Sequence, residues 1–203
     1  MRNSFASITT AALLSTVVLA RAPRVAHADA DDHPMPARVG LELGGGVQGG
    51  KIFCDSQNGF CNGFSQAAGV NLQVSYFIDR TFGFTADFWA MAHTENNFTF
   101  THIINTVGVK WRPVPIITLQ AGVGDAHASL SYGNGNNQLG VTSDNAFAIM
   151  VGAGLDVLRM RRFALSVEVR AGNGFYGDKN NDGKADVVGR NVGVGVGLTW
   201  FNF

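Results

Sequence analysis

Charge is scarce in this chain of 203 residues: 15% are Asp, Glu, Lys or Arg, and the formal net charge is zero. Such a composition argues against a disordered chain and against nucleic-acid binding, which needs a basic surface. Beyond residue 30, no continuous apolar run is long enough for a membrane helix of ~20 residues. We therefore expect no nucleic-acid partner and no helical span after that point.

Residues 1–30 are typical of a secretory signal peptide. Arg2 gives a positive start, residues 6–20 form an apolar stretch shorter than a membrane span, and small residues near position 28 offer a cleavage site. The alternative is an uncleaved N-terminal anchor. Residues 31–37 form a short acidic linker, and one domain is expected over residues 38–203.

After the linker, the dominant pattern is an alternation with period two, which places successive side chains on opposite faces of a sheet. Residues 163–170, for example, read FALSVEVR, with bulky apolar side chains at every odd position. Eight such segments occur, at residues 39–44, 70–76, 82–88, 106–111, 117–123, 147–157, 163–170 and 192–198. The chain is therefore predicted to be all-β, with eight antiparallel strands.

The connections between these segments alternate in length. Short ones lie at residues 79–80, 112–115 and 158–162, and longer or more polar ones at residues 49–66, 93–97, 132–145 and 172–190. Short periplasmic turns and longer extracellular loops are the layout of bacterial outer-membrane barrels. This layout predicts an eight-stranded antiparallel transmembrane β-barrel.

A soluble barrel also alternates, with its apolar face inward, so the composition of the two faces has to decide. The apolar face here is bulky, whereas the polar face consists mostly of small residues. Its few charges include both signs and are expected to pair within a closed lumen. This predicted polar network consists of Glu42, Asp87, Lys110, Asp156, Glu168 and Arg170. Trp89, Trp111 and Trp200, with His93, are expected in the aromatic belts at the membrane interfaces.

The chain ends in LTWFNF, and a terminal Phe on the last strand resembles the signal by which outer-membrane proteins are recognised for insertion. Together with the leader and the connection pattern, the mature chain resembles the small outer-membrane β-barrel superfamily that includes the OmpA transmembrane domain, OmpX and OmpW. The resemblance implies outer-membrane location, a partnership with the barrel-assembly machinery through Phe203, and contact with outer-membrane lipid and lipopolysaccharide. The alternation changes phase near Trp200, so either a β-bulge lies there or the signal is imperfect.

Two further motifs lie in the polar connections. Cys54 and Cys61 are seven residues apart in an exported loop and are expected to form a disulfide. The segment from Asp178 to Asp186 resembles a calcium loop of the EF-hand type, with a glycine at position six. Its candidate calcium ligands are Asp178, Asn180, Asp182, Lys184 and Asp186; the alternative is a polar surface turn.

A His-x-Ser motif, His127-Ala128-Ser129, resembles that of the outer-membrane lipid A deacylases. The chain departs from that family at Leu130, where the family has Asn, and Asp144 is the only substitute expected for the orienting carboxylate. We therefore expect no enzyme and no obligatory cofactor. The predicted function is a non-enzymatic, monomeric surface or structural protein acting through its extracellular loops. A narrow channel for small hydrophobic molecules and a lipid A hydrolase are the alternatives.

Overall fold

The computed structural model describes residues 39–56, 63–95, 98–134, 137–177 and 187–202, with side chains at most of these positions. Within these ranges every regular element is a strand. No helix in the described ranges is long and apolar enough to cross a membrane. Residues 1–38, which include the expected signal peptide and linker, lie outside the described residues.

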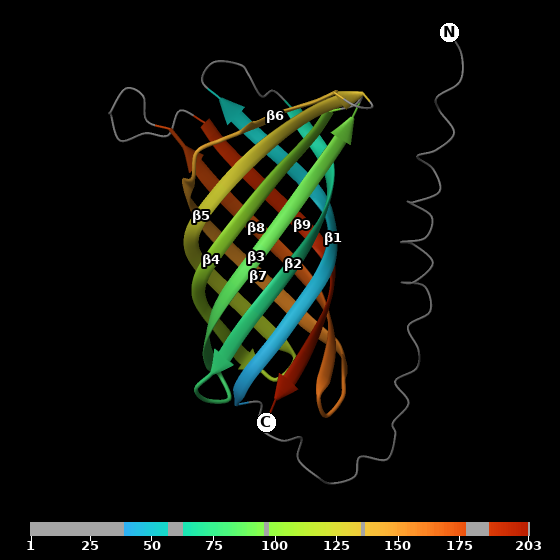
Figure 1. The fold of residues 1–203 in the computed structure, drawn as a ribbon. Coiled ribbons are helices and arrows are strands. Elements are labelled where there is room, and N and C mark those ends of the chain that lie inside the picture. Colours follow the sequence, from blue (N-terminus) through green and yellow to red (C-terminus); the bar gives the residue numbers. More distant parts are fainter. Residues whose placement is uncertain (1–38, 57–62, 96–97, 135–136, 178–186, 203) are drawn as a thin grey trace, which may run out of the picture. The chain divides into compact units, whose positions relative to one another are not determined.

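Eight strands form a closed antiparallel barrel (Figure 1). They are β1 (Gly40–Ser56), β2 (Gly63–Phe77), β3 (Phe82–Glu95), β4 (Phe98–Val114), β5 (Ile117–Asn134), β7 (Ala146–Arg159), β8 (Phe163–Tyr176) and β9 (Val187–Asn202). Each pairs with its sequence neighbour among these eight, β1 also pairs with β9, and pairing of β4 with β5 completes the ring. The predicted fold class is confirmed.

The strands are longer than the alternating segments of the sequence, because pairing continues where the apolar pattern has stopped. They have 14–18 residues, whereas about 9–11 tilted residues suffice to span a membrane. The predicted connection at residues 93–97 is wrong in part, since β3 continues to Glu95 and β4 begins at Phe98. Most of the excess length lies at the end of the barrel opposite the short turns, and β4 and β7 also extend a few residues toward the short turns.

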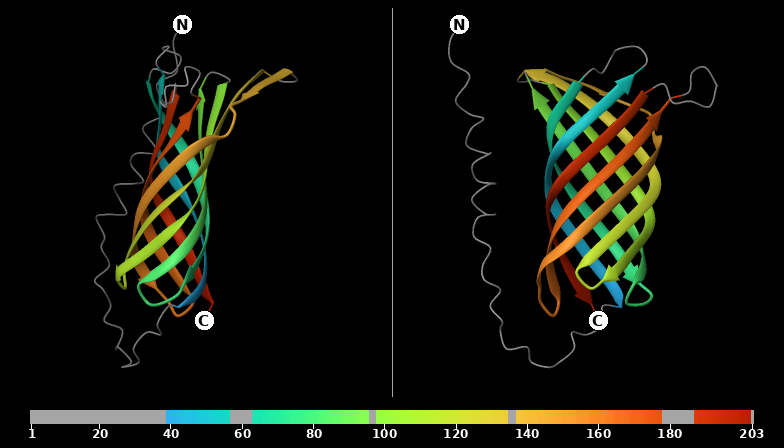
Figure 2. Two further views of the ribbon diagram at one scale, coloured as in Figure 1. Left: turned by 90° about the vertical axis from the view of Figure 1, so that its left-hand side faces the viewer. Right: turned by 180° about the vertical axis from the view of Figure 1, so that it is seen from behind.

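A ninth strand, β6 (Asn137–Thr142), lies inside the segment predicted to be the loop 132–145. It pairs only with the end of β5, from Ser129 to Asn134, and β7 joins β5 lower down, at Ala126. The resulting β5–β6 hairpin leans away from the rim of the barrel (Figure 2, left).

The two faces of the sheet differ as the sequence predicts. Along β8, Phe163, Leu165 and Val167 are exposed on the outside, while Ser166 and Glu168 are buried inside. Along β9 the outward residues from Val192 to Leu198 are all apolar and about half exposed. The outer surface is therefore a band of bulky apolar side chains.

No β-bulge lies near Trp200. β9 pairs with β1 and with β8 without a register shift, and Phe201 points inward after Thr199. The two irregularities in pairing, between Trp111 and Val114 and between Asp156 and Leu158, both adjoin short turns. Phe203 lies outside the described residues, so its role as an insertion signal stays a prediction.

The short turn between β2 and β3 is organised by one carboxylate. Asp79 accepts hydrogen bonds from the backbone N–H groups of Thr81 (2.6 Å) and Phe82 (2.8 Å). These two bonds, that from Thr81 foremost, hold the pKa of Asp79 below its usual value because they favour the ionised carboxylate.

Candidate functional site

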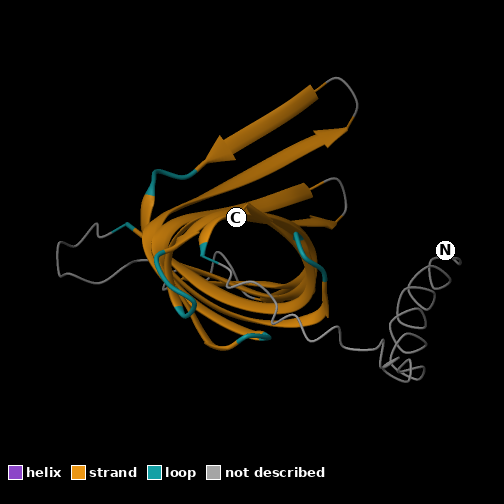
Figure 3. Cartoon of the chain, turned by 90° about the horizontal axis from the view of Figure 1, so that it is seen from below, coloured by secondary structure: helices purple, strands orange, loops and turns teal. Residues whose placement is uncertain are grey.

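The barrel interior is the candidate site, and contacts cross it at three levels. Viewed along the axis, the strands form a ring around this interior (Figure 3). Going round the ring, β3 is four strands from β8, and β4 is four strands from β9. Members of each pair therefore face each other across an eight-stranded ring, and a contact between them crosses the lumen.

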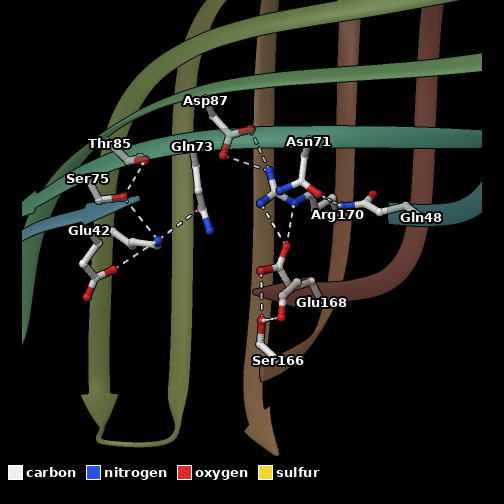
Figure 4. A network of polar contacts seen from close by, with 12 residues as sticks. Glu42, Gln48, Asn71, Gln73, Ser75, Thr85, Asp87, Ser166, Glu168 and Arg170 are labelled. Carbon is white, nitrogen blue, oxygen red and sulfur yellow. Dashed lines mark hydrogen bonds and ion pairs between the residues drawn. The ribbon is translucent and has the colours of Figure 1, made fainter. Parts of the chain in front are cut away.

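The first level is an ion cluster centred on Arg170 of β8 (Figure 4). Its Nη1 donates to both carboxylate oxygens of Asp87 on the opposite strand β3, at 2.7 and 2.8 Å. Its Nε and Nη2 donate to Glu168 at 3.2 and 3.0 Å. Ser166 donates a further bond to Glu168 at 3.1 Å. All four side chains are inward on their strands, which the period-two pattern of β3 and β8 dictates.

Beside this ion cluster, another group of charged side chains surrounds Glu42 of β1, nearer the short turns. Arg112 of β4 donates to Glu42 at 2.7 Å, and Lys110 lies 3.6 Å from its second oxygen. Lys110 also donates to Gln73 at 3.1 Å and to Ser75 at 3.2 Å. These bonds connect β1, β2 and β4 inside the barrel (Figure 4).

The two groups balance each other in charge. Asp87, Glu168 and Arg170 sum to one negative charge, whereas Glu42, Lys110 and Arg112 sum to one positive charge. All six side chains are buried. Burying ions is costly unless they are paired and hydrogen-bonded, and the neutral sum meets that requirement.

The second level is apolar and lies on the loop side of the ion cluster. Its core is a set of buried side chains from five strands: Ile52, Trp89, Met91, Ile104, Ala126, Ala148 and Met150. Trp89 of β3 reaches across to β8 and β9, where glycines make room for its ring. A Cβ added at Gly172 or Gly193 would lie 3.3 Å from indole carbons, and closer still to Ile104 and Gln48 respectively.

The third level joins β4 to β9. His102 is completely buried, and its Nδ1 lies 2.8 Å from Oδ1 of Asn191 on the opposite strand. Because that oxygen accepts, Nδ1 carries the hydrogen. With this contact the interior is bridged from wall to wall by an ion pair, an indole and a histidine–amide pair.

The cavity beside the ion contacts is small. A cavity at the short-turn end, lined by Glu42, Lys110, Arg112, Glu168 and Arg170 among others, leaves about 30 Å³ for the centres of water molecules. One water needs roughly 10–15 Å³ by the same measure. The cavity therefore suits a few waters, which can hydrogen-bond to Oε2 of Glu42 and to Nε and Nη1 of Arg112, three atoms without a hydrogen bond among the described residues.

Five of the six charged residues expected in the lumen lie in these two groups. Asp156 differs: it borders the same cavity, but its carboxylate lies 3.4 Å from Nε of Arg159 at the short-turn end. The sequence prediction assigned Arg112 to a turn, although β4 extends past it to Val114. Continuing the alternation of β4 by two residues beyond Lys110 would have placed it inside.

The structure corrects the predicted position of Trp89. The sequence prediction placed it in an interfacial belt, yet its side chain is completely buried in the lumen. The phase of β3 carried the missing signal, since Phe84, Ala86 and Phe88 are outward and Trp89 follows in the opposite phase. Trp111, by contrast, is outward and 48% exposed.

Two of the expected sites fall, wholly or in part, on residues that the structure does not describe. The calcium-loop residues from Asp178 to Asp186 and Cys61 lie outside the described residues, so the calcium site and the disulfide stay predictions. Cys54 lies near the end of β1, opposite Gly63. Among the described residues no group of three His, Cys, Asp or Glu side chains is placed to hold a metal ion.

The His-x-Ser motif lies on the outer face of β5. His127 Nδ1 is 3.9 Å from Oδ2 of Asp125, which also accepts a bond from Asn105 at 3.1 Å. The carboxylate beside the histidine is thus Asp125, and not Asp144, which lies in the link between β6 and β7. Within the described residues, no hydrogen bond joins His127 to Ser129, so the motif lacks a preformed base–nucleophile contact.

Comparison with known proteins gives a likeness of fold. No family model matches the chain, and no curated protein matches it. Among solved structures it is similar to Ail, the attachment invasion locus protein of Yersinia pestis (13% identity, TM-score 0.55), with 79% of this chain and 99% of that one covered. Ail in complex with the heparin analogue sucrose octasulfate gives 15% identity and a TM-score of 0.54, with 79% and 99% covered. The neisserial surface protein NspA gives 13% identity and 0.53, with 80% and 97% covered.

At such identities the likeness shows the fold alone. The chain has the fold of the small eight-stranded β-barrels of bacterial outer membranes.

Proposed function

We propose that this chain is an outer-membrane protein, exported by residues 1–30, whose barrel is a closed scaffold that presents its loop end at the cell surface. The observation that carries the proposal is the bridged interior. Asp87–Arg170, Trp89 and His102–Asn191 each join opposite walls. A filled lumen favours a structural or surface-interaction role over the narrow channel considered from sequence.

The apolar outer band supports the membrane location. Side chains such as Leu72 (62% exposed), Val107 (64%) and Phe84 (56%) are left uncovered by the described part of the chain. Exposing so large a continuous apolar surface to water would be unfavourable, whereas contact with the acyl chains of a membrane would not be.

The β5–β6 hairpin supports a role in surface contact. β6 pairs with β5 along one edge, and within the described part of the chain no strand pairs with its other edge. The free edge offers unpaired backbone N–H and C=O groups to another extended segment. A partner that adds a strand here would be recognised mainly through its backbone.

Two measurements test the scaffold. An epitope tag inserted between residues 135 and 136 is expected to bind antibody on intact cells, whereas the same tag between Pro115 and Ile116 becomes accessible only after the outer membrane is permeabilised. Purified protein in a planar bilayer is expected to give no discrete channel openings. Steady openings of uniform size, or a tag at 115–116 that reacts on intact cells, would contradict the proposal.

The surface-contact role is tested by replacing residues 131–140 with a two-residue turn. Cells that express the wild-type chain are expected to adhere to one another faster than cells that express the shortened chain at an equal surface level. Equal rates of sedimentation would count against the hairpin as the contact element.

A lipid A hydrolase is the second candidate, and the contact between Asp125 and His127 favours it. A carboxylate beside a histidine can orient the ring toward a nucleophile, which here would be Ser129 on the same face. Mass spectrometry of lipid A from cells that express the wild-type chain or Ser129→Ala tests this. Identical acyl patterns in both would end the hydrolase hypothesis and leave the scaffold proposal intact.

A further inference from the structure

The outer face of β4 and β5 carries a polar pair inside the apolar band. Nδ2 of Asn105 donates to Oδ2 of Asp125 at 3.1 Å, and the side chain of Asp125 is 47% exposed. The strand neighbours Ile104 and Ala126 are completely buried, so both members of the pair point outward. β3, β4 and β5 lie side by side here (Figure 1). The pair therefore faces the surroundings of the barrel and not its lumen.

Apolar side chains border this pair on both adjacent strands and on the side of the short turns. Its partners on the adjacent strands are Phe88 of β3 and Phe147 of β7. Val107 of β4 and Val123 of β5 are the next outward residues toward the short turns, and both are more than half exposed. Ionisable side chains at this level of a membrane protein are costly against acyl chains and usually face protein. The position therefore favours a protein partner over lipid.

The pair also keeps hydrogen-bonding capacity. The Asn105 amide has a second N–H, and Oδ1 of Asp125 accepts no hydrogen bond from any residue that the structure describes. His127, the next outward residue of β5 toward the loops, lies near the other carboxylate oxygen, Oδ2, at 3.9 Å. One patch thus holds both a donor and an acceptor. Such a patch is complementary to itself, since a twofold axis brings each group against the other.

Depth in the membrane favours a second copy of this chain as the partner. Two copies inserted in the same direction hold the Asn105–Asp125 pair at the same depth. A twofold axis along the membrane normal therefore brings the two pairs together. A lipid offers mainly acyl carbon at this level, and an unrelated protein would match the pair only if it carried a polar group at the same depth.

The shape of this face fits the same arrangement. A groove of about 700 Å³ extends from the pair toward β2. Ala86 is the smallest outward side chain that lines it, and its partners Val74 and Val107 are bulkier. On the other side of the pair, β7 presents the exposed side chains Ile149 and Val151. Under the twofold axis, the groove of one copy faces these β7 side chains of the other.

We propose that the outer face of β3, β4, β5 and β7 is the interface of a symmetric homodimer in the membrane, in which Asn105 of each copy donates to Asp125 of the other. The inference rests on the membrane placement under the proposed function, and it departs from the monomer expected from the sequence. The lipid A hydrolase considered above needs the same face open to lipid, so the two exclude each other.

Sedimentation equilibrium of the full refolded barrel in a density-matched neutral detergent tests the interface. The wild type is expected to form dimers. Asp125→Leu is expected to raise the dissociation constant about tenfold, because the dimer loses two interchain hydrogen bonds of the strength found between membrane helices. Asn105→Leu removes the same two bonds from the donor side and is expected to give a similar loss. Arg190→Leu removes an exposed polar side chain from β9, opposite β4 in the ring, and is the matched control, expected to associate as the wild type does.

A wild type that stays monomeric at every protein concentration would overturn the interface. Unchanged association of Asp125→Leu, or an equal loss in Arg190→Leu, would also overturn it. Ala86→Phe fills the groove and is expected to weaken the dimer while the barrel stays folded; it carries the test if Asp125→Leu fails to fold, and unchanged association would contradict the proposed face.

Heat-modifiable migration on a gel separates this inference from the proposed function. A wild-type chain that migrates as a folded barrel, and whose tag between residues 135 and 136 binds antibody on intact cells, supports the scaffold whatever its oligomeric state. If that chain sediments as a monomer, only the dimer is refuted.

Discussion

Removal of Arg170 is the sharpest test of the lumen network. Arg170→Met deletes four hydrogen bonds, two to Asp87 and two to Glu168, and leaves both carboxylates buried without their cation. Breaking a buried ion pair from one side costs about 3–5 kcal/mol, because the partner charge loses its compensation. We therefore expect the free energy of unfolding to fall by about that amount.

The assay is urea unfolding of the barrel in lipid vesicles, followed by tryptophan fluorescence. Arg161→Met removes an exposed arginine at a short turn and is expected to change the free energy by less than about 0.5 kcal/mol. The triple variant Arg170→Met, Asp87→Leu and Glu168→Met removes all three charges together and is expected to be more stable than Arg170→Met alone. If the single variant unfolds like the wild type, or if the triple variant is the least stable, the three charges do not form a coupled cluster.

Two further outcomes follow from the same geometry. Trp89→Ala is expected to cost about 3–5 kcal/mol in the same unfolding assay because it empties the apolar level of the lumen, whereas Trp111→Ala on the lipid side should cost clearly less; equal losses would contradict the inward position of Trp89. Asp79→Ala is expected to lower the urea midpoint at pH 7, and its difference from the wild type is expected to shrink as the pH falls below about 4. The pKa of Asp79 is lower in the folded state, so its contribution is present above its unfolded value of about 4 and is lost as pH falls through the folded value. A midpoint difference that persists unchanged at pH 2 would contradict this assignment.

The fold was predictable because period two is a strong signal over eight segments. In β8 the alternation from Phe163 to Arg170 assigned every side chain to its observed face. The outer halves of the strands were not predictable in the same way. There the outward positions become polar, as in Asp125, His127 and Ser129 of β5, so both faces look alike and the pattern that marks a strand disappears.

The lumen contacts were only partly predictable, for a different reason. Sequence phase places Asp87 and Arg170 inside, but it does not say that they come from opposite walls, since that depends on the order of strands around the ring. The bond between His102 and Asn191 was missed because neither residue stands out as a charge. The sequence pattern that could have indicated this bond is the occurrence of polar residues at inward positions of β4 and β9.

The same inward charges also fix the register of the barrel. Slipping one strand by a single residue exchanges its two faces, so a slip of β8 would turn Glu168 and Arg170 out toward acyl chains and turn Val167 and Val169 into the lumen. Exposing an arginine to lipid at mid-membrane costs about 2–4 kcal/mol. The slip would also leave Asp87 buried in the lumen without its cation. A slip of β4 by one residue would in the same way expose Lys110 and Arg112 to lipid. The network therefore disfavours misaligned pairings more strongly than it stabilises the native one. We infer that the six buried charges contribute mainly to the choice of register, since apolar residues in their place would stabilise the native pairing as well but would not penalise a slipped one.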